Sequence, residues 1–219
     1  HCIRRIDAKG HITTYAGSGK AGFSGDDGTA AKAQFNYIMC ITLNPSGEKL
    51  HVADLKNRRI REIDLKSDKV LTIAGNGQRG IPKDGAKATE APLVDPRAVC
   101  SDTAGNVYVL ERGGHALRVV RPDGRIYTVV GNGEKGNSDG MGSAARFNGP
   151  KHICADPSGN IYVADDVNHL IRKYEPKIGE VSSVLGRGKV KLSKPHGVTW
   201  DKGKLYIVDS SNHRILRVE

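Results

Sequence analysis

The chain has 219 residues, with 34 Lys and Arg against 24 Asp and Glu, and a formal net charge of +10 at pH 7. Hydrophobic residues make up 37% of the sequence, enough for a substantial core, yet no window approaches the ~20 consecutive apolar residues of a membrane-spanning helix. No basic and then apolar leader begins at His1. We therefore expect a soluble domain, whose cellular compartment the sequence leaves unknown.

Short apolar runs separated by turns extend along the whole chain. The runs are four to six residues long, rich in Val, Ile, Tyr and Thr, and bounded by Gly, Pro, Asp and Asn. This composition predicts β-strands rather than helices. In chain order the strands form a pair, three sets of four and a set of three, within residues 1–16, 36–74, 95–130, 150–185 and 195–219.

A nine-residue core recurs within these sets. Residues 165–173 read DDVNHLIRK, and related sequences lie at residues 54–62, 111–119 and 209–217, with half of a further copy at residues 1–5. Each full core follows an apolar run that ends in an acidic residue. A four-stranded antiparallel meander repeated every roughly 40 to 50 residues, or slightly more, is typical of a β-propeller, because radially stacked sheets cover one another's faces.

The pattern Asn-His-x-Ile-Arg, after a strand ending in Val-Ala-Asp and before a Gly-rich linker, resembles the NHL repeat. The resemblance covers nearly all of the chain. Two copies depart from the pattern, one with Glu111 and Gly113-Gly114, the other with Leu216 where the rest have Arg. The resemblance implies an all-β propeller of four-stranded antiparallel blades, in a family where six blades are usual and where members bind RNA or proteins.

We predict a single domain over residues 1–219, with repeat units of approximately 1–35, 36–93, 94–149, 150–194 and 195–219. The strands make about four blades plus a half-blade, and two arrangements remain open. Either the opening strands complete the last blade of a small ring, with one strand left over, or the chain is an open arc or fragment of a longer propeller. We favour the arc. An arc is expected to expose apolar blade faces and to self-associate.

Several apparent motifs are explained by the repeat. Residues 75–80 match the dinucleotide fingerprint G-x-G-x-x-G, but two other linkers match it too, and none opens a helix in a parallel βαβ unit. The linker Asp-Gly pairs are predicted to be turns, since they lack the spaced ligands of a calcium loop. Cys40, Cys100 and Cys154 are assigned to one position of the first strand, as buried residues too far apart for a disulfide. No metal site and no cofactor is predicted.

The acid that ends the second strand and the Arg of the core lie seven residues apart across one hairpin in three copies. The carboxylate is expected to accept hydrogen bonds from turn amides or from the guanidinium, which is a structural role. The residues assigned to this motif are Asp54, Arg61, Glu111, Arg118, Asp165, Asn168, Arg172, Asp209 and Asn212. The turn histidines are expected on the outer part of the blades, and the Ala-rich linker ends are expected to place Phe35, Leu93 and Phe147 between blades.

The residues that precede each first strand are expected to ring one end of the propeller axis, the channel mouth. The candidate ligand-binding residues there are Tyr37, Arg97, Lys151, His152 and His196, and a basic linker contributes Arg187, Lys189, Lys191 and Lys194. Positive charge of this kind attracts polyanions and suits phosphate contacts, although only Tyr37 offers a ring for base stacking. Amidating lyases, which resemble NHL propellers, hold a metal with converging histidines, but the two histidines here do not make a three-histidine site.

The sequence favours a non-catalytic scaffold that uses a propeller face to bind a protein or peptide, and no catalytic residue is assigned. The first alternative is binding of RNA or another polyanion through the basic channel-mouth face. The second alternative is a propeller-type hydrolase or lyase.

Overall fold

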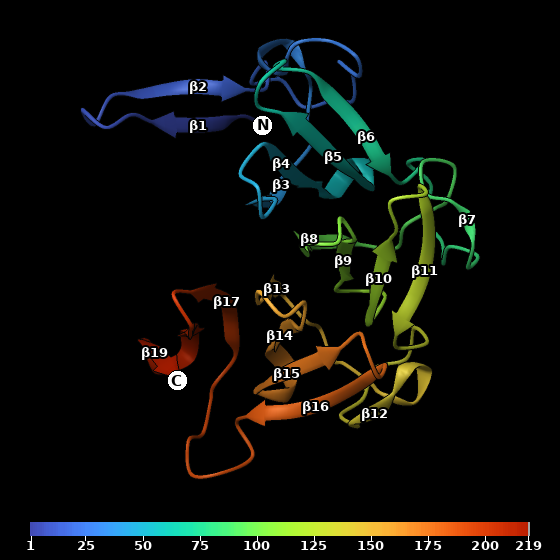
Figure 1. The fold of residues 1–219 in the computed structure, drawn as a ribbon, viewed down its shortest axis with the longest axis vertical. Coiled ribbons are helices and arrows are strands. Elements are labelled where there is room, and N and C mark those ends of the chain that lie inside the picture. The colour runs from blue at the N-terminus through green and yellow to red at the C-terminus, as the bar shows by residue number, and fades with distance from the viewer. Residues whose placement is uncertain (219) are drawn as a thin grey trace.

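The computed structural model describes residues 1–218 as a series of antiparallel meanders that follow one another along an arc (Figure 1). No α-helix occurs in this part of the chain. A hairpin comes first, followed by blades 1 to 3 of four meander strands each and blade 4 of three. The strands are β1 (Ile3–Ile6) and β2 (Ile12–Ala16) in the hairpin; β3 (Ile38–Leu43), β4 (Lys49–Asp54), β5 (Arg59–Asp64) and β6 (Val70–Ala74) in blade 1; β8 (Pro96–Ser101), β9 (Val107–Glu111), β10 (Ala116–Val120) and β11 (Arg125–Val130) in blade 2; β13 (His152–Ala155), β14 (Ile161–Asp165), β15 (Leu170–Glu175) and β16 (Glu180–Leu185) in blade 3; and β17 (Pro195–Asp201), β18 (Lys204–Asp209) and β19 (Arg214–Val218) in blade 4.

The predicted all-β propeller of four-stranded antiparallel blades is confirmed. The structure adds one feature that the sequence did not predict. The linkers contribute two short strands, β7 (Ala86–Lys87) and β12 (Gly140–Met141), which pair with the outer strands β11 and β16. Strands of two residues are too short to show a periodic pattern, so the sequence carries no signal for them.

The first strands of the blades lie side by side around the axis. β8 packs against both β3 and β13, and β13 packs against β17. Within residues 1–218 no strand pairing joins the hairpin β1–β2 to blade 4, so the described blades form an arc rather than a closed ring. The linker ends place Phe35, Leu93 and Phe147 in fully buried positions. These three side chains anchor the linkers in the core, as predicted from their position at the end of the Ala-rich segments.

Each of blades 1 to 3 contains a buried ion pair between the acid that ends its second strand and the Arg of its third strand. The shortest N to O distances are 3.6 Å for Asp54–Arg61, 2.7 Å for Glu111–Arg118 and 3.0 Å for Asp165–Arg172. All six side chains are at most 2% exposed. Buried charges persist in folded proteins when they are paired in this way.

The linkers supply a second acid to two of these arginines. Asp26 lies 2.7 Å from Arg61, and Asp139 lies 2.6 Å from Arg172. The linker aspartates are therefore more than turn residues, because they fasten each linker onto the blade that follows it. Blade 4 has Leu216 at the Arg position. There Arg214 pairs with the acid instead, and its Nε donates to Asp209 at 2.8 Å.

The turn histidines connect neighbouring blades. Each of His115, His169 and His213 adopts a left-handed conformation, with φ of 46°, 59° and 51°. The Nδ1 atoms of His1, His115 and His169 accept hydrogen bonds from the backbone N–H groups of Tyr37, Gly149 and Lys194, at 3.2, 3.2 and 3.0 Å. These partners lead into the innermost strands β3, β13 and β17, so for His115 and His169 the expected place on the outer part of the blades is wrong.

The strand register corrects the assignment of Cys40. Cys100 and Cys154 stand opposite Tyr108 and Tyr162, but Cys40 stands opposite Ala53, two positions earlier in its strand. The error came from aligning cysteines with each other instead of aligning the turns that follow them. All four cysteines are free; Cys40 and Cys100 are buried, whereas Cys154 is partly exposed.

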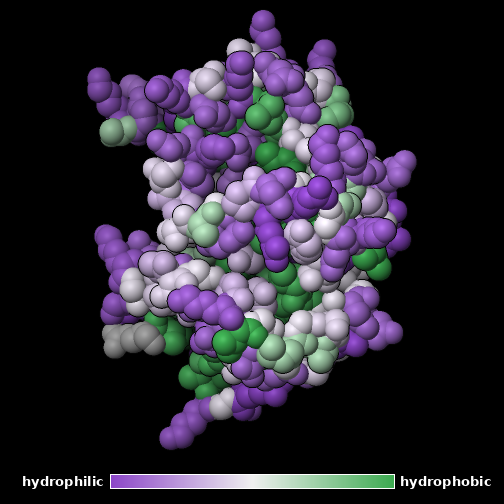
Figure 2. All heavy atoms as spheres, turned by 45° about the vertical axis from the view of Figure 1, so that its right-hand side comes forward, coloured by the Kyte–Doolittle hydropathy of each residue, from purple (hydrophilic) through white to green (hydrophobic). Residues whose placement is uncertain are grey.

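The surface agrees with the high charge of the chain. On the face drawn in Figure 2, hydrophilic side chains predominate and apolar side chains lie in separate groups. No helix within residues 1–218 has the length and apolar character needed to cross a membrane.

Candidate binding surface at the channel mouth

Three basic side chains from three blades converge at one end of the axis. Arg97 of β8 and His196 of β17 occupy β-bulges, where the register shifts by one residue, and Lys151 directly precedes β13. A bulge turns a side chain out of the regular alternation of a strand. Nη2 of Arg97 lies 3.4 Å from Nε2 of His196, although the two residues are 99 positions apart.

Two residues that the sequence analysis missed complete this cluster. Asp166 lies with its Oδ1 3.7 Å from Nζ of Lys151, and the charge of Arg112 acts on Arg97, Lys151 and His196. Both follow the acid that ends the second strand of their blade. That turn faces the same end of the axis, so the first residue of the turn could have been predicted to lie at the channel mouth. We call Arg97, Arg112, Lys151, Asp166 and His196 the channel-mouth cluster.

The cluster carries an excess of positive charge. Burial first, and then Arg112, lowers the pKa of Arg97, while Asp95 and Asp166 act in the opposite direction. The pKa of Lys151 is lowered by burial, and Asp166 only partly offsets this effect. The pKa of His196 is lowered by burial and then by Lys151 and Arg97. Since repulsion among like charges contributes to all three shifts, an anionic ligand would relieve it.

Tyr37 lies near this cluster but not at the equivalent position. The register aligns Met39, rather than Tyr37, with the bulge residues Arg97 and His196. Tyr37 precedes the strand, has φ of 66° and is 51% exposed. Its ring lies 5.2 Å from Nζ of Lys56, and its phenol is one of the groups that act on Arg97. Tyr37 therefore offers an exposed ring at the edge of the surface.

His152 does not take part in the surface. Its Nδ1 lies 3.0 Å from the carbonyl oxygen of Val198, and its Nε2 lies 3.8 Å from Sγ of Cys40. Because a carbonyl can only accept, Nδ1 carries the proton of the neutral ring. Both ring nitrogens are thus engaged within the fold, which indicates a packing role for His152.

Replacing His152 by Gln is expected to reduce the acid sensitivity of the fold. Burial lowers the pKa of His152 below its usual 6.5, although the bond to Val198 opposes this shift. The unfolded chain then binds the proton more readily, so stability falls as the pH drops through about 6.5 toward the folded pKa. Thermal unfolding between about pH 7.5 and 5.5 measures this loss. The slope should be shallower in the variant, and unchanged when the exposed His213 is replaced by Gln instead; equal slopes in all three proteins would contradict the assignment.

The basic linker lies apart from the cluster. Arg187 pairs with Asp139 at 3.5 Å and also contacts Asn137, and Lys191 donates to the carbonyl oxygen of Arg187. The loop that carries them runs outward between β16 and β17 (Figure 1). Lys189 is exposed on this loop, and only Lys194 lies at its inner end, next to His169. Arg187, Lys189 and Lys191 therefore do not extend the channel-mouth cluster.

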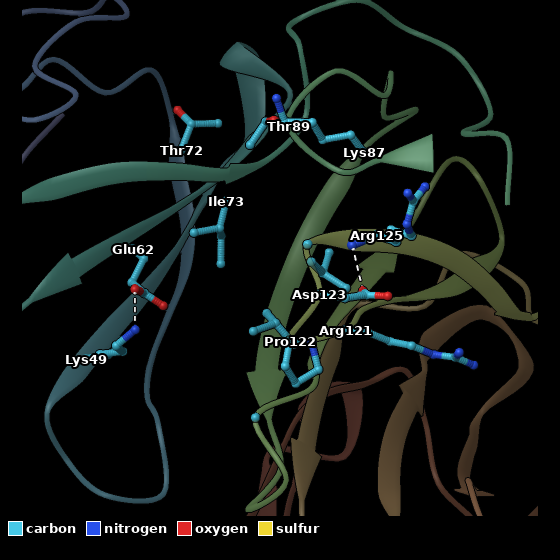
Figure 3. A pocket seen from close by; sticks show the side chains of 14 residues that line it. Lys49, Glu62, Thr72, Ile73, Lys87, Thr89, Arg121, Pro122, Asp123 and Arg125 are labelled. Atoms are coloured by element: carbon cyan, nitrogen blue, oxygen red, sulfur yellow. Dashed lines mark hydrogen bonds and ion pairs between the residues drawn. The ribbon is translucent and has the colours of Figure 1, made fainter. Parts of the chain in front are cut away.

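Within residues 1–218, no group of three or more His, Cys, Asp or Glu side chains is arranged to hold a metal ion. A cavity with a volume of about 620 Å³ lies elsewhere, between blades 1 and 2 (Figure 3).

Curated proteins of similar sequence include one that is named for the NHL repeat. The chain is 28% identical over 236 residues to NHL repeat-containing protein 2 of Homo sapiens, covering 88% of the chain and 32% of that protein. It is 30% identical over 233 residues to Protein SUPPRESSOR OF QUENCHING 1, chloroplastic, of Arabidopsis thaliana, covering 95% of the chain and 22% of that protein. The chain thus spans about a third or less of the length of these relatives.

Solved structures show the same fold. A chain in the crystal structure of a nidogen/laminin complex superposes with a TM-score of 0.68 at 16% identity, over 100% of this chain and 67% of that one. A streptogramin B lyase structure gives a TM-score of 0.60 at 12% identity, over 100% of this chain and 61% of that one. At these identities the likeness concerns the fold alone.

The family model of the NHL repeat matches residues 147–174 and 192–217. With five copies of the motif in register and four antiparallel blades, the chain belongs to the NHL-repeat family of β-propellers.

Proposed function

We propose that the chain is a non-catalytic binding scaffold and that the channel-mouth cluster receives an acidic segment of a protein partner. The observation that carries this proposal is the convergence of Arg97, Lys151 and His196, from three separate blades, on one surface. Asp166 and Asp95 are the acidic groups that act on these cations. β8 and β13 each pack between two neighbouring first strands, and β17 packs against β13. The surface is therefore formed before the partner arrives, and a preformed surface loses little entropy on binding.

The chemistry of the cluster fits carboxylates. Arginine and lysine donate charge-assisted hydrogen bonds to carboxylate oxygens, and Nε of Arg97 is buried without a partner in the free protein. RNA would satisfy the same charges, but single-stranded RNA usually also needs several stacking rings. Tyr37 is the aromatic residue identified beside the cluster. An acidic peptide is therefore the occupant that we favour.

Replacing Arg97 and Lys151 together by Glu is expected to weaken binding of a fluorescein-labelled Glu-rich peptide about 100-fold, because two attractive charges become repulsive. Fluorescence anisotropy measures the affinity. The matched control replaces Arg187 and Lys189 by Glu, which makes the same change of net charge away from the axis. The control should retain nearly the parent affinity.

Two results would contradict the proposal. Equal losses in both double variants would mean that net charge alone attracts the peptide. Tight binding of a random single-stranded RNA, with a steep loss between about 50 and 200 mM salt and no peptide binding, would instead establish polyanion recognition.

A further inference from the structure

A polar cavity lies in the seam between blades 1 and 2, away from the channel mouth. It has a volume of about 310 Å³ and adjoins the larger cavity of about 620 Å³, with which it shares Lys49 and Glu62. Figure 3 shows Lys49 and Glu62 on one side of the larger cavity and Pro122 and Asp123 on the other. Volumes from roughly 300 to 1,000 Å³ are typical of small-molecule sites.

Blade 1 departs from the other blades at this seam. The position of His51 is occupied by Tyr108, Tyr162 and Tyr206 in blades 2, 3 and 4. The hydroxyl groups of Tyr108 and Tyr162 lie 3.3 and 3.4 Å from the carboxylates of Asp102 and Asp156. Blade 1 has Asn44 where those aspartates stand, so it lacks this tyrosine–aspartate contact. Blades 2 and 3 show that the fold does not require His51.

Glu62 fixes the proton on the His51 ring. The two residues stand directly opposite each other on β4 and β5, with Nε2 of His51 3.0 Å from Glu62 Oε2. Burial acts to raise the pKa of Glu62, but hydrogen bonds from His51 and from Lys49, at 2.7 Å, hold it below its usual value. An ionised carboxylate only accepts, so Nε2 carries a proton, which makes Nδ1 the acceptor in the neutral form of the ring.

Two polar atoms in this seam are buried without a partner. His51 is 2% exposed, and its Nδ1 has no hydrogen bond within the protein. Ser101, at the end of β8 in blade 2, is 7% exposed, and its Oγ is likewise unpartnered. Both residues line the same cavity. Buried polar groups normally have partners, so two unpaired ones on residues that line one cavity from two blades indicate an occupant.

The remaining lining identifies the class of occupant. Its charged groups are already engaged, since Lys49 pairs with Glu62 and the Asp102 carboxylate accepts from Ala104 and Asn106. The remaining groups are the acceptor nitrogen Nδ1 of His51 and the hydroxyl of Ser101, together with the short polar side chain of Thr103. Such a surface offers hydrogen bonds from uncharged groups. We propose that the cavity between blades 1 and 2 binds a neutral, hydroxyl-rich small molecule of the monosaccharide or polyol class, which donates a hydroxyl proton to His51 Nδ1 and bonds Ser101 Oγ.

Saturation-transfer NMR of the purified chain with glucose, galactose, mannitol and inositol tests this site. At least one of these probes is expected to receive saturation from the parent protein. His51→Tyr and Ser101→Ala should each weaken its binding about tenfold, the effect of losing one buried hydrogen bond. Each variant installs the residue that another blade has at the same position, Tyr108 or Ala155, so both are expected to fold.

The matched control is Arg97→Ala, which alters the channel mouth and should leave the saturation signal unchanged. No transfer to any of the four probes would mean that the cavity holds only water, and the proposal would be wrong. Equal transfer in the parent, His51→Tyr and Ser101→Ala would also overturn it, because binding would then occur elsewhere. A loss of the saturation signal in Arg97→Ala alone would show that the ligand binds at the channel mouth.

Discussion

Replacing Asp165 by Ala is expected to lower the free energy of unfolding by about 3–5 kcal/mol, the usual cost of removing one partner from a buried ion pair. Asp165 accepts hydrogen bonds from the backbone N–H of Asn148, from Nδ2 of Asn168 and from Nη1 of Arg172, at 2.8, 2.8 and 3.0 Å. The variant removes the acceptor of these donors and leaves Arg172, which is 0% exposed, with Asp139 as its remaining carboxylate partner. Urea unfolding followed by circular dichroism measures the loss.

The stability lost on removing Asp165 is larger than the net contribution of the Asp165–Arg172 pair to the free energy of unfolding. Burial raises the pKa of Asp165 to about 6, although its hydrogen bonds and Arg172 act to lower it, so the carboxylate is costly to desolvate. The control is Glu90→Ala, which breaks an ion pair with Lys87 whose side chains are 70% and 67% exposed. It should cost no more than about 0.5 kcal/mol. Similar losses in the two variants would show that burial does not govern the cost.

Replacing Gly131 by Ala is expected to cost about 2–4 kcal/mol through backbone strain and displacement of a neighbouring strand. Gly131 follows β11 with φ of 83°, and a Cβ there would lie 2.4 Å from the carbonyl oxygen of His115. Backbone must therefore move to admit a methyl group. Thermal and urea unfolding measure the effect.

The matched control is Gly159→Ala. Gly159 has nearly the same φ, 87°, but a Cβ would meet nothing within 4 Å. Its substitution should cost only about 1 kcal/mol, from the left-handed conformation itself. If both variants lose the same stability, the close approach at Gly131 has no energetic effect. The same approach occurs at Gly17, Gly75 and Gly186, where Cβ would meet a backbone oxygen at 2.5, 2.1 and 2.4 Å. This packing explains why the first glycine of G-x-G recurs in the linkers without a nucleotide site.

Much of the fold could be predicted from the sequence because each strand is short, apolar and bounded by turn residues. The spacing of Asp165 and Arg172 also pointed to their contact across one hairpin. The position of Cys40 could not be found by matching residue types, since β-strand register follows the turns: the segment from Asn44 to Gly47 aligns with that from Asp102 to Gly105. Contacts between segments far apart in sequence, such as Asp139 with Arg172, leave no local pattern.

The candidate sites were less predictable than the fold. Arg97, Lys151 and His196 could be found because they precede equivalent strands. Asp166 and Arg112 lie in turns of other hairpins, and only the radial arrangement brings them to the same end of the axis. The contact of His51 with Glu62 depends on cross-strand register, but the substitution of His for Tyr at one copy of a repeat was visible in the sequence.

The histidine Nδ1 bonds and the linker aspartates connect each blade to the adjacent segment only. The described part of the molecule therefore resembles a short one-dimensional array, in which stability comes largely from single blades and from the interfaces between neighbours. Contacts across the axis, Arg97 with His196 and Cys40 with His152, add links between alternate blades. Opening blade 2 breaks two interfaces and disrupts the largest core cluster, which extends from β3 to β16. Amide hydrogen exchange should consequently be slowest in β8–β10, and the β1–β2 hairpin can fray without releasing the centre.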